Sequence, residues 1–190
     1  MDAIRVMGVD PGFASLGVVV LEQRQGQIQA LAANVLRTKK ASRKVLRDLR
    51  VSADDQRRLR AFWEGLQGIA AVHAPQALAV ETYAPQPGRT GGNGWKAAVV
   101  YGLVQGLGLS QGLHVLPFVP SDLKRVFTNS ASASKEAVAD VVLGQVTGLA
   151  AFLDRLPAGQ HEHVTDAAGH ALLGLREMVE MRKLMGVAVP

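Results

Sequence analysis

The feature that most constrains the fold is a short apolar run that ends abruptly at a turn. Residues 4–9 read Ile-Arg-Val-Met-Gly-Val and are followed by Asp10-Pro11-Gly12. An apolar run bounded by turn residues predicts a buried strand, because Pro presets φ and Gly tolerates a positive φ. Residues 18–21 are Val-Val-Val-Leu, so the two runs are predicted to pair as a hairpin. Asp10 then ends a strand that enters the core.

Asp10 has two interpretations at this position. The end of a buried strand is where rigid backbone meets solvent, so a carboxylate there is well placed for chemistry. Aspartate also commonly caps its own turn through a hydrogen bond to the backbone. The functional interpretation therefore depends on whether other carboxylates converge on Asp10.

The remaining segments predict further strands and helices. Apolar runs favour strands at residues 77–80 and 114–119, and residues 27–35 favour a third, although their alanines leave a helix open. Helical spacing and boundary residues predict helices over these segments: Asp54 or Asp55 to His73, 96–111, a short helix from Pro120, 135–146 and 163–183. His161 and Glu162 are expected in the turn before the last helix. The order predicts an α/β fold, with helices flanking a mixed five-stranded sheet in one domain spanning residues 1–190.

Composition narrows the class of protein. Cysteine is absent, which excludes disulfides and thiolate-bound metal. No run of about 18 apolar residues and no apolar leader segment is present. The protein is therefore expected to be soluble and cytoplasmic.

Basic residues are concentrated in one segment. The chain has a formal charge of +5, but residues 37–60 contain ten Lys or Arg against three Asp. The remainder has an excess of two acidic residues. A basic segment beside a mildly acidic body indicates a polyanion partner, most simply nucleic acid. A solvated charged loop is the alternative interpretation.

Titratable residues at predicted strand ends and on the last helix form a candidate site. Asp10 and Glu81 each end a strand, and His163 and Asp166 are spaced i, i+3 on one helix face, with His170 one turn further. Clustered carboxylates repel one another unless a divalent cation binds, and hard oxygen ligands favour Mg²⁺ or Mn²⁺. Two such ions in one site can promote phosphodiester cleavage. The lack of a GxxxxGK[ST] motif argues against a P-loop nucleotide site.

Five short motifs resemble one family in their order and setting. They are Val9-Asp10-Pro11-Gly12, Arg37-Thr38-Lys39, Val80-Glu81-Thr82, Pro120-Ser121-Asp122-Leu123-Lys124-Arg125 and His163-Val164-Thr165-Asp166-Ala167-Ala168. Over most of its length the chain resembles the RuvC-type Holliday junction resolvases. The resemblance implies a ribonuclease H-like fold and a metal-dependent endodeoxyribonuclease. Such an enzyme would resolve junctions by paired symmetric nicks in DNA recombination and repair.

The resemblance also implies roles for individual residues. Asp10, Glu81 and Asp166 correspond to the metal-binding catalytic carboxylates of the family. His163 stands where many members have Asp, and it is expected to act as a fourth catalytic metal ligand. Two Mg²⁺ or Mn²⁺ ions per active site are implied. His170 is expected beside the ligands or as an ordinary helix residue, rather than as a ligand.

Six residues are expected to contact DNA: Lys39, Arg43, Tyr83, Arg89, Lys124 and Lys135. Lys124 and Lys135 correspond to the phosphate-contacting lysines of the family. Ala84 occupies the usual position of the aromatic residue that enters the junction, so Tyr83 is expected either to substitute for it or to pack on the body. Residues 41–53 resemble an insertion, interpreted either as an extra basic DNA contact or as a solvated loop.

The implied working unit is a homodimer on a four-way DNA junction, with a branch-migration motor complex as a further partner and no membrane contact. Residues 96–111 are the predicted dimer helix, because apolar residues surround it and Gly102 and Gly106 allow close approach. The alternative interpretation is that this helix is sandwiched inside one subunit. Two rival functions are a non-catalytic nucleic-acid-binding protein on the same fold and a fragment of an actin-like ATPase or sugar kinase. The first requires the loss of a carboxylate, and the second requires a further domain and phosphate loops.

Overall fold

The computed structural model describes residues 3–42, 51–82 and 94–186. Within them the strands are β1 (Ile4–Asp10), β2 (Ser15–Arg24), β3 (Gln27–Arg37), β4 (Ala77–Glu81) and β5 (His114–Phe118). The helices are α1 (Val51–His73), α2 (Gly94–Ser110), α3 (Pro120–Thr128), α4 (Lys135–Gln145), α5 (Leu149–Leu153) and α6 (His161–Leu184), with a 3₁₀ turn, η2, at Ala158–Gln160. No helix in these ranges is long and apolar enough to cross a membrane.

The five strands form one mixed sheet in the order β3-β2-β1-β4-β5. β2 runs antiparallel to both β1 and β3. The β1–β2 pair is the predicted hairpin. β4 runs parallel to β1, and β5 runs parallel to β4. The C-terminal ends of β1, β3, β4 and β5 therefore lie at the same edge of the sheet, which we call the carboxyl edge. The predicted mixed five-stranded sheet is confirmed, and residues 27–35 belong to a strand.

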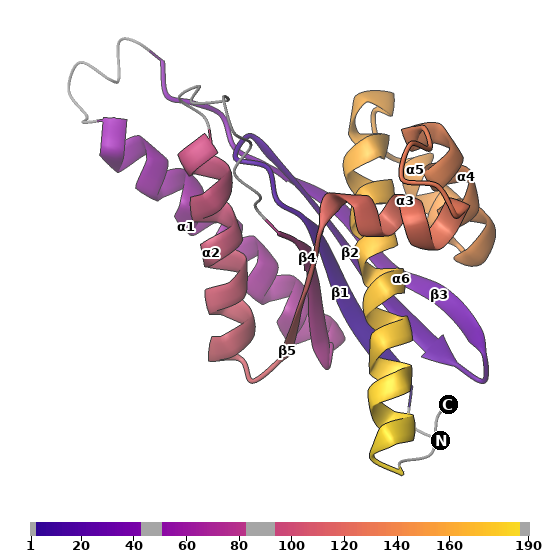
Figure 1. The fold of residues 1–190 in the computed structure, drawn as a ribbon. Coiled ribbons are helices and arrows are strands. Elements are labelled where there is room, and N and C mark those ends of the chain that lie inside the picture. Colours follow the sequence, from indigo (N-terminus) through magenta and orange to yellow (C-terminus); the bar gives the residue numbers. More distant parts are fainter. Residues whose placement is uncertain (1–2, 43–50, 83–93, 187–190) are drawn as a thin grey trace.

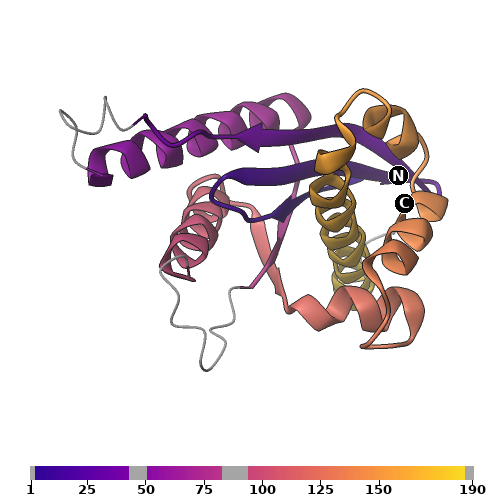
Figure 2. The same ribbon diagram turned by 90° about the horizontal axis from the view of Figure 1, so that it is seen from above.

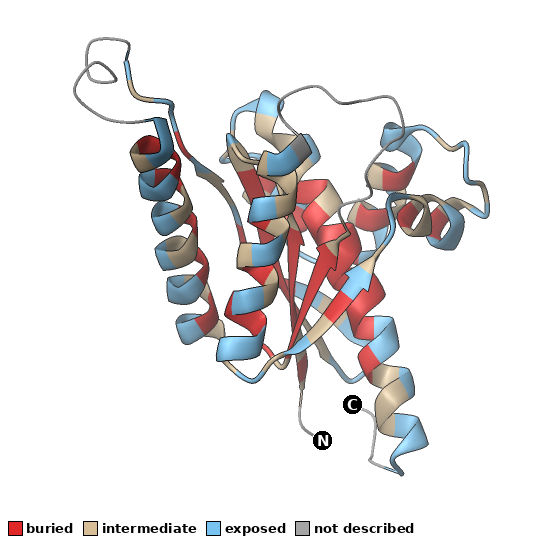
Figure 3. Cartoon of the chain, turned by 60° about the vertical axis from the view of Figure 1, so that its left-hand side comes forward, coloured by how far each residue is buried: buried red, intermediate tan, exposed pale blue. Residues whose placement is uncertain are grey.

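Helices cover both faces of this sheet (Figures 1 and 2). α1 and α2 lie on one face, and α6 lies on the other together with α3, α4 and α5. Side chains alternate along β1: Ile4 and Val6 pack in the core on the α6 side, whereas Met7 and Val9 pack in the core with α1 and α2. Figure 3 shows the buried residues gathered on the strands and on the inner sides of the helices.

The same alternation brings two predicted ligands to one place. Gly8 faces α6, so Asp10, two residues further, is on that side as well. In β4, Ala77 and Ala79 pack in the core on the α6 side. Alternate side chains of a strand lie on the same face, so Glu81 lies on that side as well. Val9 pairs with Val80 between the two parallel strands. Asp10 and Glu81 therefore end adjacent strands on the same face of the carboxyl edge.

Two glycines let α6 approach the sheet closely. A Cβ on Gly8 would lie 2.0 Å from the backbone oxygen of Ala167, and one on Gly17 would lie 2.1 Å from that of His163. Gly17 is also the partner of Asp10 across the β1–β2 ladder. Any larger residue at either position would push the helix away. The first turns of α6 are thus held directly over the end of β1.

The start of α1 differs from the sequence prediction. α1 begins at Val51 rather than at Asp54 or Asp55. Asp54 therefore lies within the first turn, and its carboxylate accepts a hydrogen bond from the backbone N–H of Ala41, a tertiary contact. Residues 51–53 of the predicted insertion are therefore helical, whereas residues 43–50 lie outside the described residues.

Two further differences lie near the C-terminus. α6 begins at His161 rather than His163, because the 3₁₀ turn η2 leads into it without a break. His161 and Glu162 are therefore helical and not turn residues. The sequence analysis does not predict α5, whose five residues are too few for a helical period to be visible.

Candidate active site

Asp10 and His163 are in direct contact at the carboxyl edge. Nδ1 of His163 lies 2.7 Å from Oδ2 of Asp10, which is hydrogen-bond length. The side chains of His163 and Asp10 are 34% and 18% exposed. The hydrogen bond to the Asp10 carboxylate raises the pKa of His163, against the opposing effect of partial burial. The structure thus joins two of the four predicted ligands.

Asp166 lies on the same face of α6 as His163, three residues further along. Burial, and then the negative charge of Asp10, raises the pKa of Asp166 from 3.8 to about 6. The ammonium group of Lys135 lies 3.6 Å from Oδ2 of Asp166 and opposes this rise without cancelling it. Asp10 and Asp166 therefore repel each other, and a bound cation would remove that repulsion.

Glu81 and Asp166 line one pocket of about 260 Å³ at the carboxyl edge. Lys124 of α3 and Lys135 at the start of α4 line it too, together with three apolar side chains. The pocket therefore combines two of the predicted carboxylates with both lysines that were predicted to contact phosphate.

Glu162 is a residue of this site that the sequence analysis placed in a turn. It forms a hydrogen-bonded ion pair with Lys135. This hydrogen bond raises the pKa of Lys135 and lowers the pKa of Glu162. Both side chains are more than half exposed, so solvent screens the pair. Glu162 lies in the first turn of α6, where acidic residues are favoured, and this preference is the signal that could have placed it in the helix.

The donor set at this edge suits a hard divalent cation. It offers the side chains of the four predicted ligands: Asp10, Glu81, His163 and Asp166. A nitrogen of an imidazole or an ammonium group lies within 4 Å of each carboxylate, at 2.7 Å for Asp10 and at 3.6 Å for Glu81 and Asp166. Within the described ranges, no three His, Asp or Glu side chains are grouped closely enough to hold a metal ion. Metal binding would therefore require these side chains to turn toward one another. A bound cation would relieve the repulsion between Asp10 and Asp166 that contributes to the raised pKa of Asp166.

The residues predicted to contact DNA fall into two groups. Lys124 and Lys135 line the pocket, and Lys39 is exposed just beyond β3 at the same edge of the sheet. The other three lie outside the described residues, so their roles stay predictions: Arg43, Tyr83 and Arg89.

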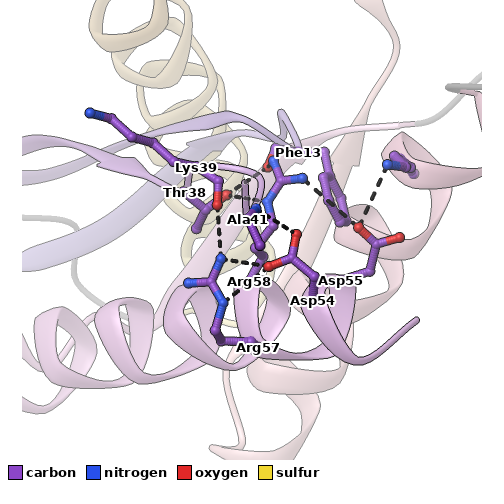
Figure 4. A network of polar contacts seen from close by, with 9 residues as sticks. Phe13, Thr38, Lys39, Ala41, Asp54, Asp55, Arg57 and Arg58 are labelled. Carbon is purple, nitrogen blue, oxygen red and sulfur yellow. Dashed lines mark hydrogen bonds and ion pairs between the residues drawn. The ribbon is translucent and has the colours of Figure 1, made fainter. Parts of the chain in front are cut away.

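A second polar cluster lies at the carboxyl edge on the α1 side of the sheet (Figure 4). We call it the arginine network, and it consists of Phe13, Thr38, Asp54, Asp55, Arg57 and Arg58. Arg58 donates hydrogen bonds to Oγ1 of Thr38 and to the backbone oxygen of Phe13, the third residue after Asp10. Its guanidinium carbon lies 4.2 Å from the centre of the Phe13 ring, a cation–π contact. The network therefore anchors the turn that follows Asp10.

The arginine network changes the interpretation of the basic segment. Arg57 donates a hydrogen bond to the Asp54 carboxylate, and a guanidinium nitrogen of Arg58 lies 3.9 Å from the Asp55 carboxylate. Two of the ten basic side chains between residues 37 and 60 are thus matched within the fold and not free for a polyanion. Both pairs are spaced i, i+3 within α1, so helical spacing could have indicated them, whereas the hydrogen bonds of Arg58 to Thr38 and Phe13 join segments far apart in the chain.

Comparison with solved structures shows that the fold is shared. The structure of Thermus thermophilus RuvC in complex with a Holliday junction substrate matches with a TM-score of 0.69 at 22% identity, covering 98% of this chain and 99% of that one. The yeast mitochondrial Holliday junction resolvase matches with a TM-score of 0.59 at 12% identity, covering 96% and 86%. The predicted fold is that of these resolvases.

Sequence comparison identifies the family. The crossover junction endodeoxyribonuclease RuvC of Chlorobaculum parvum is 28% identical over 90% of this chain and 80% of its own length. That of Trichlorobacter lovleyi is 29% identical over 73% of this chain and 71% of its own length. The family model described as crossover junction endodeoxyribonuclease RuvC matches residues 6–169, a range that includes all four predicted ligands. The chain therefore belongs to the RuvC family of crossover junction endodeoxyribonucleases, which are metal-dependent nucleases.

Proposed function

We propose that this nuclease resolves four-way DNA junctions by paired symmetric nicks, in DNA recombination and repair. The observation that supports this most strongly is the convergence of the four predicted ligands at one edge of the sheet, beside a pocket lined by Lys124 and Lys135. Carboxylates and an imidazole suit a divalent cation, and lysines suit the phosphate backbone. The non-catalytic alternative requires the loss of a carboxylate, yet the sequence has all three: Asp10, Glu81 and Asp166.

The ligands and the lysines have separate tasks in this proposal. The residues that would hold two Mg²⁺ or Mn²⁺ ions are Asp10, Glu81, His163 and Asp166. When bound, such ions activate water and stabilise the leaving oxygen in phosphodiester cleavage. His163 is uncharged as a ligand, so the site has one negative charge fewer than an all-carboxylate set. Lys124 and Lys135 bind the phosphates of the cut strand, with Lys135 exchanging its contact to Glu162 for one to DNA.

Nicking of a synthetic four-way junction tests the assignment. Asp10→Asn removes a metal ligand but no phosphate contact, so we expect cleavage to be lost in both Mg²⁺ and Mn²⁺ while junction binding is retained. Asp154→Asn changes an exposed aspartate at the end of α5 and serves as the matched control with normal cleavage. Full nicking by Asp10→Asn would contradict the ligand assignment. Junction binding without nicking by the wild type in either metal would favour the non-catalytic function.

We further propose that the working unit is a twofold homodimer formed through α2. Such a dimer presents two identical sites, as the paired cutting of two like strands requires. One stripe of α2 supports this: Val99 and Leu109 are 37% and 73% exposed, and a Cβ on Gly102 or Gly106 would meet nothing within 4 Å. The described chain therefore does not require glycine at these two positions for its own packing, and a second copy of α2 can approach closely there.

The structure corrects which residues of α2 face a partner. The sequence analysis treated α2 as apolar on every side, but Val100, Val104 and Leu107 are fully buried in the core with α1 and the sheet. A charge at Val104 would therefore disrupt the fold, so a test of the dimer has to change a residue of the exposed stripe. The branch-migration motor complex stays a predicted partner.

The dimer is tested by mass in solution. Val99→Glu should produce monomers, whereas Val72→Glu, which changes a 76% exposed valine on α1, should leave the mass unchanged. A wild-type protein that is monomeric at micromolar concentration and still makes paired nicks would contradict the dimer.

A further inference from the structure

His170 is a buried polar side chain without a hydrogen bond. It is 0% exposed, and within the described part of the chain neither ring nitrogen has a hydrogen-bond partner. The large majority of buried polar groups in folded proteins are hydrogen-bonded, and each exception calls for an explanation. A leucine would fill this part of α6 without that penalty, so packing alone does not explain the histidine.

The position of His170 points to the active site. It lies four residues after Asp166 and seven after His163, so the three share one face of α6. Its Nε2 lies 3.6 Å from Oε2 of Glu81, whose side chain is 31% exposed at the end of β4. The distance is longer than a hydrogen bond, and a small rotation of Glu81 or one bridging water would close it.

We propose that His170 is a positioning residue that holds the Glu81 carboxylate through its Nε2–H. The inference rests on the proposed function, in which Glu81 is a metal ligand. Carboxylates that bind metals are themselves oriented by hydrogen bonds from neighbouring groups, and loss of such a partner typically costs 10–100-fold in metal affinity or activity. Glu81 ends a strand and lines an open pocket, so a fixed donor behind it restricts the directions in which its oxygens point.

The alternative is that His170 has only a packing role, and the two roles predict different metal affinities for a variant without the imidazole. Replacing His170 with Leu removes two buried nitrogens and keeps an apolar volume in the core. If His170 orients Glu81, the variant should bind metal more weakly while its thermal stability without metal stays equal or rises. If His170 only packs, the variant should bind metal as the wild type does.

Mn²⁺ binding to the DNA-free protein, measured by calorimetry, separates these roles. We expect His170→Leu to weaken binding about 10–100-fold. His170→Gln should bind within a few-fold of the wild type, because the glutamine Nε2 reaches the place of the histidine Nε2. His170→Asn is equally polar but too short, so it should resemble the leucine variant. Met178→Leu, a conservative change deep in α6, should alter nothing.

The outcomes separate this inference from the function on which it rests. If Glu81→Gln weakens Mn²⁺ binding but His170→Leu does not, the positioning role is wrong and the ligand set stands. If Glu81→Gln also binds Mn²⁺ normally, Glu81 is not a ligand and both fail. Should the leucine variant not fold, the Gln and Asn pair decides, and equal Mn²⁺ affinity in the two would overturn the inference.

Discussion

Two polar clusters lie at the carboxyl edge, one on each face of the sheet, and they use similar residues in opposite ways. In the arginine network the carboxylates and Arg58 are buried, with Asp54 3% and Arg58 5% exposed, and the side chain of Arg57, 58% exposed, covers Asp54 from the solvent side. The carboxylate cluster, which we define as Asp10, Lys135, His163 and Asp166, is partly open, with side chains between 18% and 59% exposed. One cluster is closed by its own contacts, and the other is accessible from solvent.

One carboxyl group in each cluster shows what this difference means. A hydrogen bond from Arg57 lowers the pKa of Asp54, whereas burial and the charge of Asp10 raise the pKa of Asp166 to about 6. A lowered pKa marks a carboxylate that the fold stabilises in its charged form, and a raised pKa marks one whose ionisation opposes folding. The comparison indicates that the arginine network holds the fold, while the carboxylate cluster places the proposed metal ligands together at a cost in stability.

The largest effect is expected from opening the arginine network. Arg58→Met should lower the free energy of unfolding by about 3 kcal/mol, the lower end of the range for a broken buried ion pair, because Lys96 still lies 3.6 Å from Asp55. Arg60→Met, on an exposed neighbouring position, should change it by less than about 0.5 kcal/mol. Urea denaturation measures both. Equal stability of the two variants would show that the network does not hold the fold.

The second effect is a pH dependence of opposite sign in the two clusters. The Asp166 carboxyl titrates near 6 in the fold and near 3.8 when unfolded, so its ionisation destabilises the metal-free protein above pH 6. Asp166→Asn should therefore raise stability by up to about 3 kcal/mol at pH 8. The gain should shrink as the pH falls from 6 toward 4 and vanish below that.

Asp54→Asn should behave in the opposite way. The pKa of Asp54 is lower in the fold than the unfolded value of 3.8, so its contribution to stability is present above that value and is lost as the pH falls through the folded pKa. The variant should be less stable at pH 7 and approach the wild type in strong acid. Denaturation curves of both variants across this pH range make the comparison, and shifts of the same sign would contradict it.

A smaller effect is expected from the lysines of the pocket. If Lys124 and Lys135 contact phosphates, changing both to Gln should weaken junction binding and reduce the slope of log affinity against log salt by up to about 2. Lys183→Gln, at the far end of α6, should leave the slope unchanged. Junction titrations at several salt concentrations test this, and identical slopes for wild type and double variant would place these lysines away from the DNA.

The smallest effect concerns the metal preference of the carboxylate cluster. An imidazole ligand suits Mn²⁺ better than Mg²⁺, so the wild type should nick junctions at least as fast in Mn²⁺ as in Mg²⁺. His163→Asp should shift the ratio of nicking rates toward Mg²⁺ by a few-fold. An unchanged ratio would place His163 outside the metal's immediate ligands.

The carboxylate cluster was more predictable from sequence than the arginine network. Asp10 and Glu81 each end a short apolar run. Because side chains alternate between the two faces of a strand, the buried residues before them fix the face on which they lie. His163 and Asp166 follow from helical spacing. The resemblance to a family placed these segments in one site, because spacing alone does not show that the start of α6 meets the end of β1.

The missing parts depend on contacts between segments far apart in the chain. Arg58 joins Thr38 and Phe13 across 20 and 45 residues, and helical spacing within α1 cannot predict these partners. Asp54 has the sequence of a helix start but accepts a hydrogen bond from Ala41 instead. His170 looks like an ordinary helix residue until its burial and its distance to Glu81 are known.

Junction nicking by one variant of each cluster tests whether the carboxylate cluster is catalytic and the arginine network structural. Asp166→Asn and Asp54→Asn remove the same charge on opposite faces of one edge. At saturating junction and pH 8, under conditions in which both variants are folded, we expect that the more stable Asp166→Asn does not cleave. The less stable Asp54→Asn should cleave at a rate close to that of the wild type. Wild-type cleavage by Asp166→Asn, or loss of cleavage by folded Asp54→Asn, would contradict the division between a catalytic and a structural cluster.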